Sequence, residues 1–184
     1  MKIGLVGFQG GGKSTVFELL TGVAPDASKS HSGQVGLAIV ADERFDQLVE
    51  LYQPRKVSPA RIELFDTPGL DRRLQESNPQ RLSVIREAAA LVQVIGAHSG
   101  VEPLEEITRF TDELLLADLA ILNNRIARLE VDASKPRPDR DELQAELEAL
   151  QPLVESLEDG LTLAEIELND LQVRAVRSFG LLTG

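Results

Sequence analysis

Short apolar runs alternate with amphipathic stretches through the first hundred residues. The apolar runs have the length of strands and are bounded by polar or turn-forming residues. They comprise residues 2–6, 37–40, 61–65 and 91–95. The stretches between them place apolar residues at helical spacing and predict helices over residues 15–20, 45–52 and 78–89. Strands that alternate with helices are typical of an α/β fold with a largely parallel sheet.

From residue 103 onward the pattern changes to one apolar residue every three or four positions. This 4-3-4-3 stepping is the seam of a coiled coil. It occurs in two series: Leu115, Leu119, Leu122, Ile126 and Leu129, then Leu143, Leu147, Leu150, Val154 and Leu157. Two prolines lie between the series, in residues 133–141, and predict a turn. We therefore expect an antiparallel coiled-coil helical hairpin.

A short last helix is predicted over residues 170–179, with Asn169 as its N-cap. These patterns divide the chain into three parts. We expect an α/β core over residues 1–102, a helical hairpin over 103–160, and a segment over 161–184 whose helix returns to the core.

The first strand leads directly into a phosphate-binding loop. Residues 7–14 read Gly, four residues, then Gly-Lys-Ser, and a helix follows. Main-chain N–H groups of such a loop and the helix N-terminus surround an anion. Lys13 would reach the β- and γ-phosphates, and the Ser14 hydroxyl would bind Mg²⁺. The candidate nucleotide-binding residues are Gly7, Gln9, Gly10, Gly11, Gly12, Lys13, Ser14 and Thr15.

A second nucleotide signature, Asp66-Thr-Pro-Gly69, follows the predicted strand over residues 61–65. Asp66 would hold Mg²⁺ through a water molecule, and the Gly69 N–H would contact the γ-phosphate. A DxxG sequence alone is weak, because ordinary acidic turns also produce it. Its place after a strand, downstream of a phosphate loop, favours a nucleotide site.

Composition limits the partners and the location of the chain. The net charge of −11 and a pI near 4.7 argue against broad binding to nucleic acids or anionic membranes. The sequence has no cysteine, which excludes disulfides and thiolate metal sites. No apolar run approaches the roughly 18 residues of a membrane span. We expect a cytoplasmic protein without a membrane partner.

These motifs resemble the Obg-related translation-factor GTPases, most closely the YchF / Obg-like ATPase family. The resemblance covers nearly the whole chain. It rests on MKIGLVG…GGGKSTVFELLTG, ADERFDQLVELYQPRKVSPARIELFDTPGL and VEPLEEITRFTDELLLADLAILNNRIARLE. It implies a P-loop NTPase, a three-layer αβα sandwich with an inserted coiled-coil hairpin, whose second strand runs antiparallel to its neighbour.

The resemblance also implies Mg²⁺, hydrolysis of ATP or GTP, and association with ribosomes. The family's base-reading motif and TGS domain would lie beyond Gly184, so the preference between ATP and GTP stays open. We expect a divergent member that lacks the C-terminal part, or one that pairs a bare sheet edge with another chain.

Several site positions differ from the usual pattern of these enzymes. Leu70 stands where Ras-type enzymes carry a water-orienting glutamine, a hydrophobic substitution that the resembled family shares, and it predicts slow hydrolysis. Ser28, Ser30 and Ser32 are candidates for the family's switch I metal ligand, and Ser30 is the nearest by spacing. His98 lies near a family loop histidine that is suspected in catalysis, so Lys13, Gly69 and His98 are the candidate catalytic residues.

The sequence leaves several alternatives open. The chain could instead be a non-hydrolysing nucleotide-binding module that acts through its coiled coil. Arg72 and Arg73 could stabilise charge near the γ-phosphate or form a solvated loop. The hairpin tip carries Lys135, Arg137 and Arg140 and could contact RNA or an acidic partner, or serve as a solubilising turn. Self-association through a sheet edge or the coiled coil is also possible.

Overall fold

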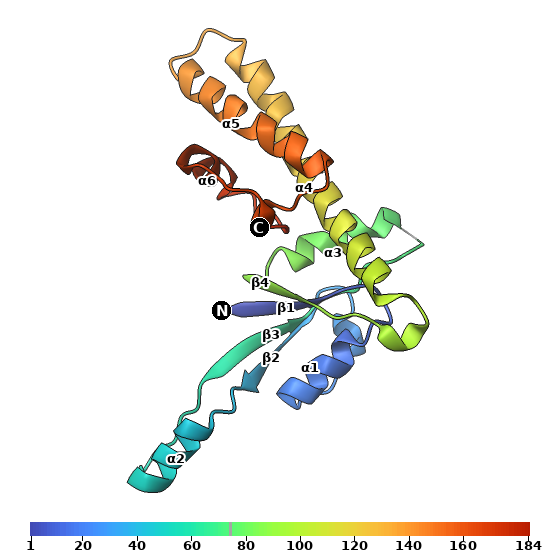
Figure 1. Cartoon of the computed structure of the whole chain (residues 1–184), viewed down its shortest axis with the longest axis vertical. Helices are drawn as coiled ribbons and strands as arrows, with labels where there is room; N and C mark the ends of the chain where they lie inside the picture. Colours follow the sequence, from blue (N-terminus) through green and yellow to red (C-terminus); the bar gives the residue numbers. More distant parts are fainter. Residues whose placement is uncertain (74) are drawn as a thin grey trace. The chain divides into compact units, whose positions relative to one another are not determined.

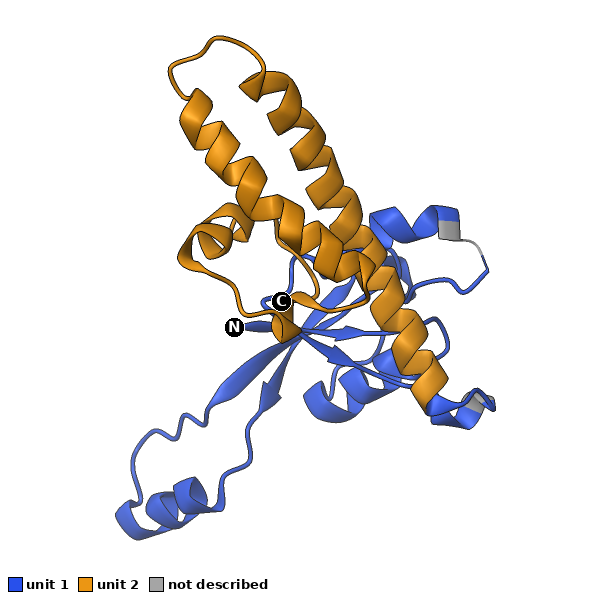
Figure 2. Ribbon diagram, turned by 45° about the horizontal axis from the view of Figure 1, so that its top comes forward, with its two compact units in different colours: residues 1–103 blue, residues 104–184 orange. Residues whose placement is uncertain are grey.

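The structure, a computed structural model, describes residues 1–73 and 75–184. It contains two compact units, residues 1–103 and residues 104–184 (Figure 2). None of its described helices is both long and apolar enough to cross a lipid bilayer.

A four-stranded mixed sheet forms the centre of the first unit (Figure 1). Its strands are β1 (Lys2–Val6), β2 (Gln34–Ile39), β3 (Arg61–Asp66) and β4 (Ala90–Gln93), in the order β2-β3-β1-β4. β1 runs parallel to β3 and β4, whereas β2 runs antiparallel to β3. The predicted antiparallel second strand is therefore confirmed. β2 begins at Gln34, earlier than predicted, because it pairs with β3 as far as Asp66.

Helix α1 (Lys13–Thr21) covers one face of this sheet. Its Phe17 is fully buried and packs with Leu5 of β1 and Leu64 of β3. Gly36 of β2 makes room for this ring, since a Cβ there would lie 2.7 Å from Phe17 Cζ. α1 and the strands are thus joined by apolar contacts that start directly after the phosphate loop.

Helix α2 (Glu43–Tyr52) ends before Pro54, as the sequence predicts, yet it buries none of its residues. Its N-terminus is capped by Asp42, whose side chain accepts a 3.0 Å hydrogen bond from the Arg44 N–H. Tyr52 is 74% exposed, and Leu48 and Leu51 are exposed as well. The helical periodicity therefore located α2 without indicating whether its apolar side is covered.

Helix α3 (Asn78–Ile85) is shorter than predicted. Its expected extension to Ala89 is wrong, because the Ala89 N–H donates to the Lys2 carbonyl at 2.8 Å and the chain then enters β4. β4 itself begins and ends earlier than the predicted run over residues 91–95.

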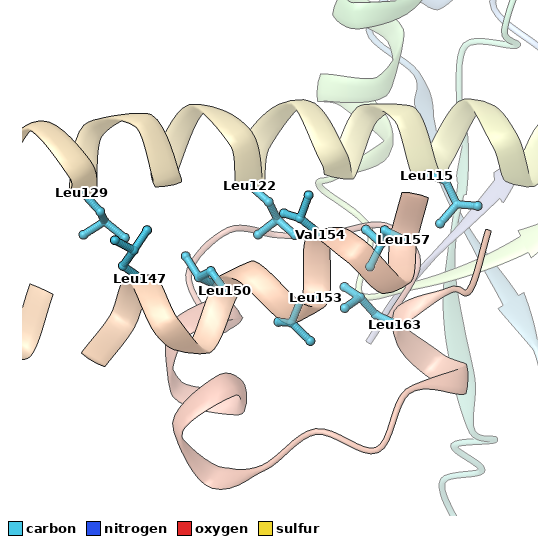
Figure 3. Close-up of a cluster of buried hydrophobic side chains, with 9 residues drawn as sticks. All are labelled: Leu115, Leu122, Leu129, Leu147, Leu150, Leu153, Val154, Leu157 and Leu163. Carbon is cyan, nitrogen blue, oxygen red and sulfur yellow. The ribbon is translucent and has the colours of Figure 1, made fainter. Parts of the chain in front are cut away.

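The second unit contains α4 (Pro103–Ala133), α5 (Arg140–Glu158) and α6 (Asp170–Val176). Buried leucines join α4 to α5: in Figure 3, Leu129 lies beside Leu147 and Leu115 beside Leu157, so the two helices run in opposite directions. The buried cluster comprises Leu115, Leu122, Leu129, Leu147, Leu150, Leu153, Val154, Leu157 and Leu163.

Residues 161–184 pack within this second unit. Asn169 caps α6 as predicted, because its side chain accepts from the N–H groups of Leu171 and Gln172 at 3.0 and 2.9 Å. α6 ends at Val176, before the predicted end at residue 179. The buried Asp118 carboxylate of α4 accepts hydrogen bonds from the Leu182 N–H and from the Thr183 N–H and hydroxyl.

Candidate nucleotide-binding site

The phosphate loop joins β1 to α1 and depends on glycine at defined positions. Gly7 has φ +141°, and a Cβ there would lie 2.5 Å from the Val94 carbonyl oxygen. Gly12 has φ +90° and is the N-cap of α1. Both backbone conformations are rare for residues with a side chain. The loop therefore reaches the helix N-terminus in the geometry that a phosphate cradle requires.

Lys13 lies where the two nucleotide signatures meet. It is buried, and its Nζ donates to the Phe8 carbonyl at 2.9 Å. A Cβ on Gly69 would lie 2.5 Å from Lys13 Nζ and 2.8 Å from the Gln9 nitrogen. The DxxG glycine thus approaches the loop closely enough that only glycine fits there.

The DxxG segment is held against the loop by main-chain hydrogen bonds. The Leu70 N–H donates to the Gly7 carbonyl at 3.1 Å, and the Leu70 carbonyl accepts from the Gln9 N–H at 2.9 Å. Leu70 is fully buried. Its side chain is therefore part of the core and does not extend toward a phosphate.

One pocket of about 500 Å³ brings these segments together. Ser14 and Gly10 line it from the loop side, and Asp66 and Gly69 line it from the end of β3. Gly7, Gly11 and Gly12 shape the backbone beside it, whereas Thr15 is exposed on α1. The lining residues are Gln9, Gly10, Lys13, Ser14, Pro25, Asp26, Ala27, Lys29, Ser30, His31, Gln34, Asp66, Thr67, Pro68, Gly69 and Arg81.

The segment over residues 24–34 is small and polar in composition but has local structure. It contains a 3-10 helix, η1 (Ala27–Lys29), which Asp26 caps by accepting from the Ser28 N–H at 2.9 Å. Hydrogen bonds from the Ser28 hydroxyl and N–H lower the pKa of the Asp26 carboxyl. Buried Gln34 holds the segment by accepting from the Asp26 N–H at 2.8 Å. Ser30, the candidate switch I ligand, lies on this pocket wall.

His98, a candidate catalytic residue, lies outside the described lining of the pocket. It lies exposed in a 3-10 helix, η3 (Ala97–Ser99). Arg72 and Arg73 are also outside that lining, and the Arg72 guanidinium lies 4.9 Å from the centre of the Phe8 ring.

Sequence reasoning missed Arg81, which lines the pocket from α3. Its Nη1 donates to the Gly69 carbonyl. With the Gln9 amide oriented so that its oxygen faces Arg81, this oxygen accepts from Nη2 at 2.9 Å. A lone arginine on a predicted helix gave no signal of this position.

Asn78 uses its side chain for contacts outside α3. It is the first residue of α3, and its Oδ1 accepts from the Asp71 N–H at 2.9 Å while its Nδ2 donates to the Asp71 carbonyl at 3.2 Å. This side chain therefore ties the segment after DxxG to α3.

The pocket also offers groups that fit a magnesium ion bound with a nucleotide. Asp66 Oδ1 is buried and has no hydrogen-bond partner among the described residues. Ser14 supplies a hydroxyl on the same pocket wall. Mg²⁺ in phosphate sites is bound by few protein oxygens, together with waters and phosphate. That no three His, Cys, Asp or Glu side chains cluster in the described part of the chain is compatible with this arrangement.

Comparison with known proteins agrees with this geometry. Residues 2–125 match the family described as 50S ribosome-binding GTPase. Curated relatives include the ribosome-binding ATPase YchF of Bacillus subtilis, 29% identical over 98% of this chain and 53% of its own length. The Obg-like ATPase homolog of Schizosaccharomyces pombe is 28% identical over 100% of this chain and 48% of its own length.

A solved structure, the Schizosaccharomyces pombe YchF GTPase, has the same fold, with a TM-score of 0.76. It is 24% identical, and the match covers 100% of this chain and 54% of that one. The chain spans about half the length of the curated relatives that it matches. The predicted resemblance is confirmed: the chain belongs to the 50S ribosome-binding GTPase family and is most like the YchF / Obg-like ATPases within it.

Proposed function

We propose that this chain is a Mg²⁺-dependent nucleoside triphosphatase that hydrolyses ATP or GTP at the γ-phosphate. The observation that carries the proposal is the meeting of Lys13, Gly69 and the unpartnered Asp66 oxygen around one pocket. An ammonium group, a main-chain donor and a metal-binding carboxylate are the groups that phosphoryl transfer requires.

Different residues of the pocket would bind the phosphates and stabilise the charge on them. The loop amides and the α1 N-terminus hold the phosphates. Lys13 exchanges its hydrogen bond with the Phe8 carbonyl for one with a β- or γ-phosphate oxygen. Ser14 and Asp66, the latter through water, would hold Mg²⁺, and Ser30 is a further candidate ligand. A metal ion held by these residues would neutralise charge that develops on the phosphates.

The attacking water lacks the usual orienting side chain, because Leu70 is buried and held by the loop. Gly69 can contact the γ-phosphate through its N–H but cannot activate water. We therefore expect slow turnover by this chain. His98, exposed in η3, is a weaker candidate for a catalytic role.

A single-turnover assay with γ-labelled ATP and GTP tests this proposal. Phosphate release in Mg²⁺, its loss in EDTA, and its loss in Lys13→Ala would support it. Nucleotide retained without any phosphate release would instead support the second candidate, a non-hydrolysing nucleotide-binding module. The buried Leu70 favours that alternative, so the wild-type rate decides between them.

We also propose that the protein is a cytoplasmic, ribosome-associated switch, since the Bacillus subtilis relative is named a ribosome-binding ATPase. The α4–α5 pair would act as an inserted coiled-coil hairpin. At its tip, Lys135 pairs with Asp132 at 3.0 Å and Arg137 pairs with Asp139 at 3.0 Å. These pairs offset the basic charge that an RNA contact would use, which favours a solubilising turn at the tip.

Co-sedimentation with 70S ribosomes, with and without each nucleotide, tests the association. Lys135→Ala and Arg137→Ala in the same assay would lower ribosome binding strongly if the tip contacts RNA. Sedimentation velocity of the chain alone tests self-association through a sheet edge or the helical pair.

A further inference from the structure

The pocket is lined in part by basic side chains that come from neither the phosphate loop nor the DxxG segment. Besides Lys13, the basic side chains on the described pocket wall are Lys29 and Arg81, with His31 as a titratable neighbour. Lys29 is exposed on η1, whereas Arg81 is half-buried on α3. Arg81 is therefore the better-placed of the two for a fixed contact.

The Arg81 guanidinium bridges the two segments that would enclose the γ-phosphate. One nitrogen donates to the carbonyl of Gly69, whose N–H is the expected γ-phosphate donor. With the Gln9 amide oriented so that its oxygen faces Arg81, another lies 2.9 Å from that oxygen in the phosphate loop. Gly69 also borders Lys13 Nζ, so the guanidinium and the ammonium group approach the same end of the pocket.

Packing and hydrogen bonds of α3 fix the position of Arg81. It is the fourth residue of α3, a helix whose Leu82 and Ile85 are buried. Asn78, one turn earlier, binds the main chain of Asp71 through two hydrogen bonds. The segment after DxxG and the helix that carries Arg81 are thus tied together, which holds the side chain toward the pocket.

Because Leu70 is apolar, it cannot assist phosphoryl transfer as a polar side chain would, and another residue has to do so. In enzymes of this reaction class, charge on the transferring phosphoryl group can be stabilised by an arginine, supplied by the same chain or by a partner. A guanidinium presents several donors in one plane and binds phosphoryl oxygens bidentately. Among the described residues, the Arg81 guanidinium donates to the Gly69 carbonyl and, with the Gln9 amide so oriented, to the Gln9 amide oxygen. Both acceptors are neutral oxygens, which phosphate oxygens can replace.

We propose that Arg81 is a catalytic residue that contacts the γ-phosphate oxygens in the transition state. This inference rests on the proposed hydrolysis. A water oxygen bonds to the γ-phosphorus, the bond to the β–γ bridging oxygen breaks, and nucleoside diphosphate, inorganic phosphate and a proton are released. Arg81 donates hydrogen bonds throughout and transfers no proton. Without triphosphate, the Arg81 guanidinium stays hydrogen-bonded to Gly69 and Gln9.

The test compares wild type with Arg81→Ala and Arg81→Lys, and uses Gln80→Ala as the control, since Gln80 is the exposed neighbour on α3. We expect Arg81→Ala to lower the single-turnover rate by roughly 10²–10³-fold, at the low end of arginine-finger effects or just below it. The dissociation constant for the Mg²⁺-triphosphate should change less than about fivefold, because the contact strengthens in the transition state. Arg81→Lys keeps the positive charge but lacks the planar set of donors, so it should recover part of the rate.

A second measurement separates catalysis from folding and from ground-state binding. Nucleoside diphosphate with aluminium fluoride mimics the transferring phosphoryl group. Arg81→Ala should weaken binding of this complex at least tenfold more than binding of the triphosphate. Thermal unfolding of each variant checks the fold, and Arg81→Gln replaces Arg81→Ala if the latter unfolds.

The outcomes distinguish this inference from the proposed function. Wild-type hydrolysis with equal rates and equal analogue binding in the Arg81 variants would overturn the role of Arg81 and leave the triphosphatase standing. A wild-type chain that retains triphosphate but neither releases phosphate nor binds the aluminium fluoride complex would overturn both. Equal losses of triphosphate and analogue binding would show that Arg81 acts in ground-state binding, which contradicts the inference.

Discussion

The phosphate loop and the leucine cluster between α4 and α5 use opposite means to specify structure. The loop relies on missing side chains: Gly7 leaves room for the Val94 carbonyl, and Gly69 leaves room for Lys13. The helical pair relies on side-chain volume, with Leu122 and Leu150 fully buried between the helices. Phosphate binding at the loop would depend on main-chain geometry, whereas the fold of the helical pair depends on apolar burial.

This difference predicts that the two regions fail in different measurements. Changes at the loop should alter nucleotide affinity with little change in the stability of the helical unit. Changes among the buried leucines should alter the stability of the helical unit with little change in affinity. Single substitutions in each region test this division.

Leu122→Ala should give the largest effect, a loss of about 2–5 kcal/mol in the unfolding free energy of the helical unit. The side chain is fully buried, so truncation removes apolar contact and leaves a cavity. Urea unfolding of the whole chain, followed by far-UV circular dichroism, measures it. Leu116→Ala is the matched control on α4, because Leu116 is 64% exposed. Similar losses in both variants would contradict the burial argument.

Lys13→Ala should weaken Mg²⁺-ATP and Mg²⁺-GTP binding by about 1.5–3 kcal/mol, the range for hydrogen bonds to charged groups. Isothermal titration calorimetry measures the change, and the urea midpoint of the helical unit should stay constant. Lys29→Ala, at the exposed side of the same pocket, should lose less affinity. If the two lysine variants lost equal affinity, Lys13 would have no special place in the site.

Asp118→Asn should destabilise the second unit by about 1–3 kcal/mol, because one buried carboxylate oxygen accepts three hydrogen bonds from residues 182–183. An amide in its place carries one acceptor oxygen and no charge. Asp112→Asn, at an exposed position of α4, is the control and should change stability within about 0.5 kcal/mol. Hydrogen exchange at the Leu182 and Thr183 amides should rise in Asp118→Asn alone.

The ion pair between Arg125 and Glu146 should give the smallest effect, about 0.2–1 kcal/mol of coupling. Arg125 Nε and Nη2 lie 2.7 and 2.6 Å from the two carboxylate oxygens, and this bonding raises the pKa of Arg125. The Arg125 side chain is 37% exposed, so solvent screens the pair. A double-mutant cycle with Arg125→Met and Glu146→Gln measures the coupling. A value above about 2 kcal/mol would show that α4 and α5 depend on charge as well as on leucine packing.

Much of the fold was predictable from the sequence, with errors at the ends of elements. The strands, the helical spacing in α4 and α5 and the cap at Asn169 depend on local patterns. The start of β2 and the end of α3 are set by pairing with β3 and by the contact of Ala89 with Lys2, which lie far apart in the chain. α2 shows the same limit, since its periodicity is helical but none of its residues is buried.

Local sequence accounts for the phosphate loop, the DxxG segment and the leucine series, because glycine spacing and helical period act through neighbouring residues. Tertiary contacts are needed to explain why Leu70 is buried, why Asn78 binds Asp71 and why Arg81 reaches the pocket. Those positions depend on contacts between segments that are separate in the sequence, and residue type alone does not encode the direction in which a side chain on α3 points.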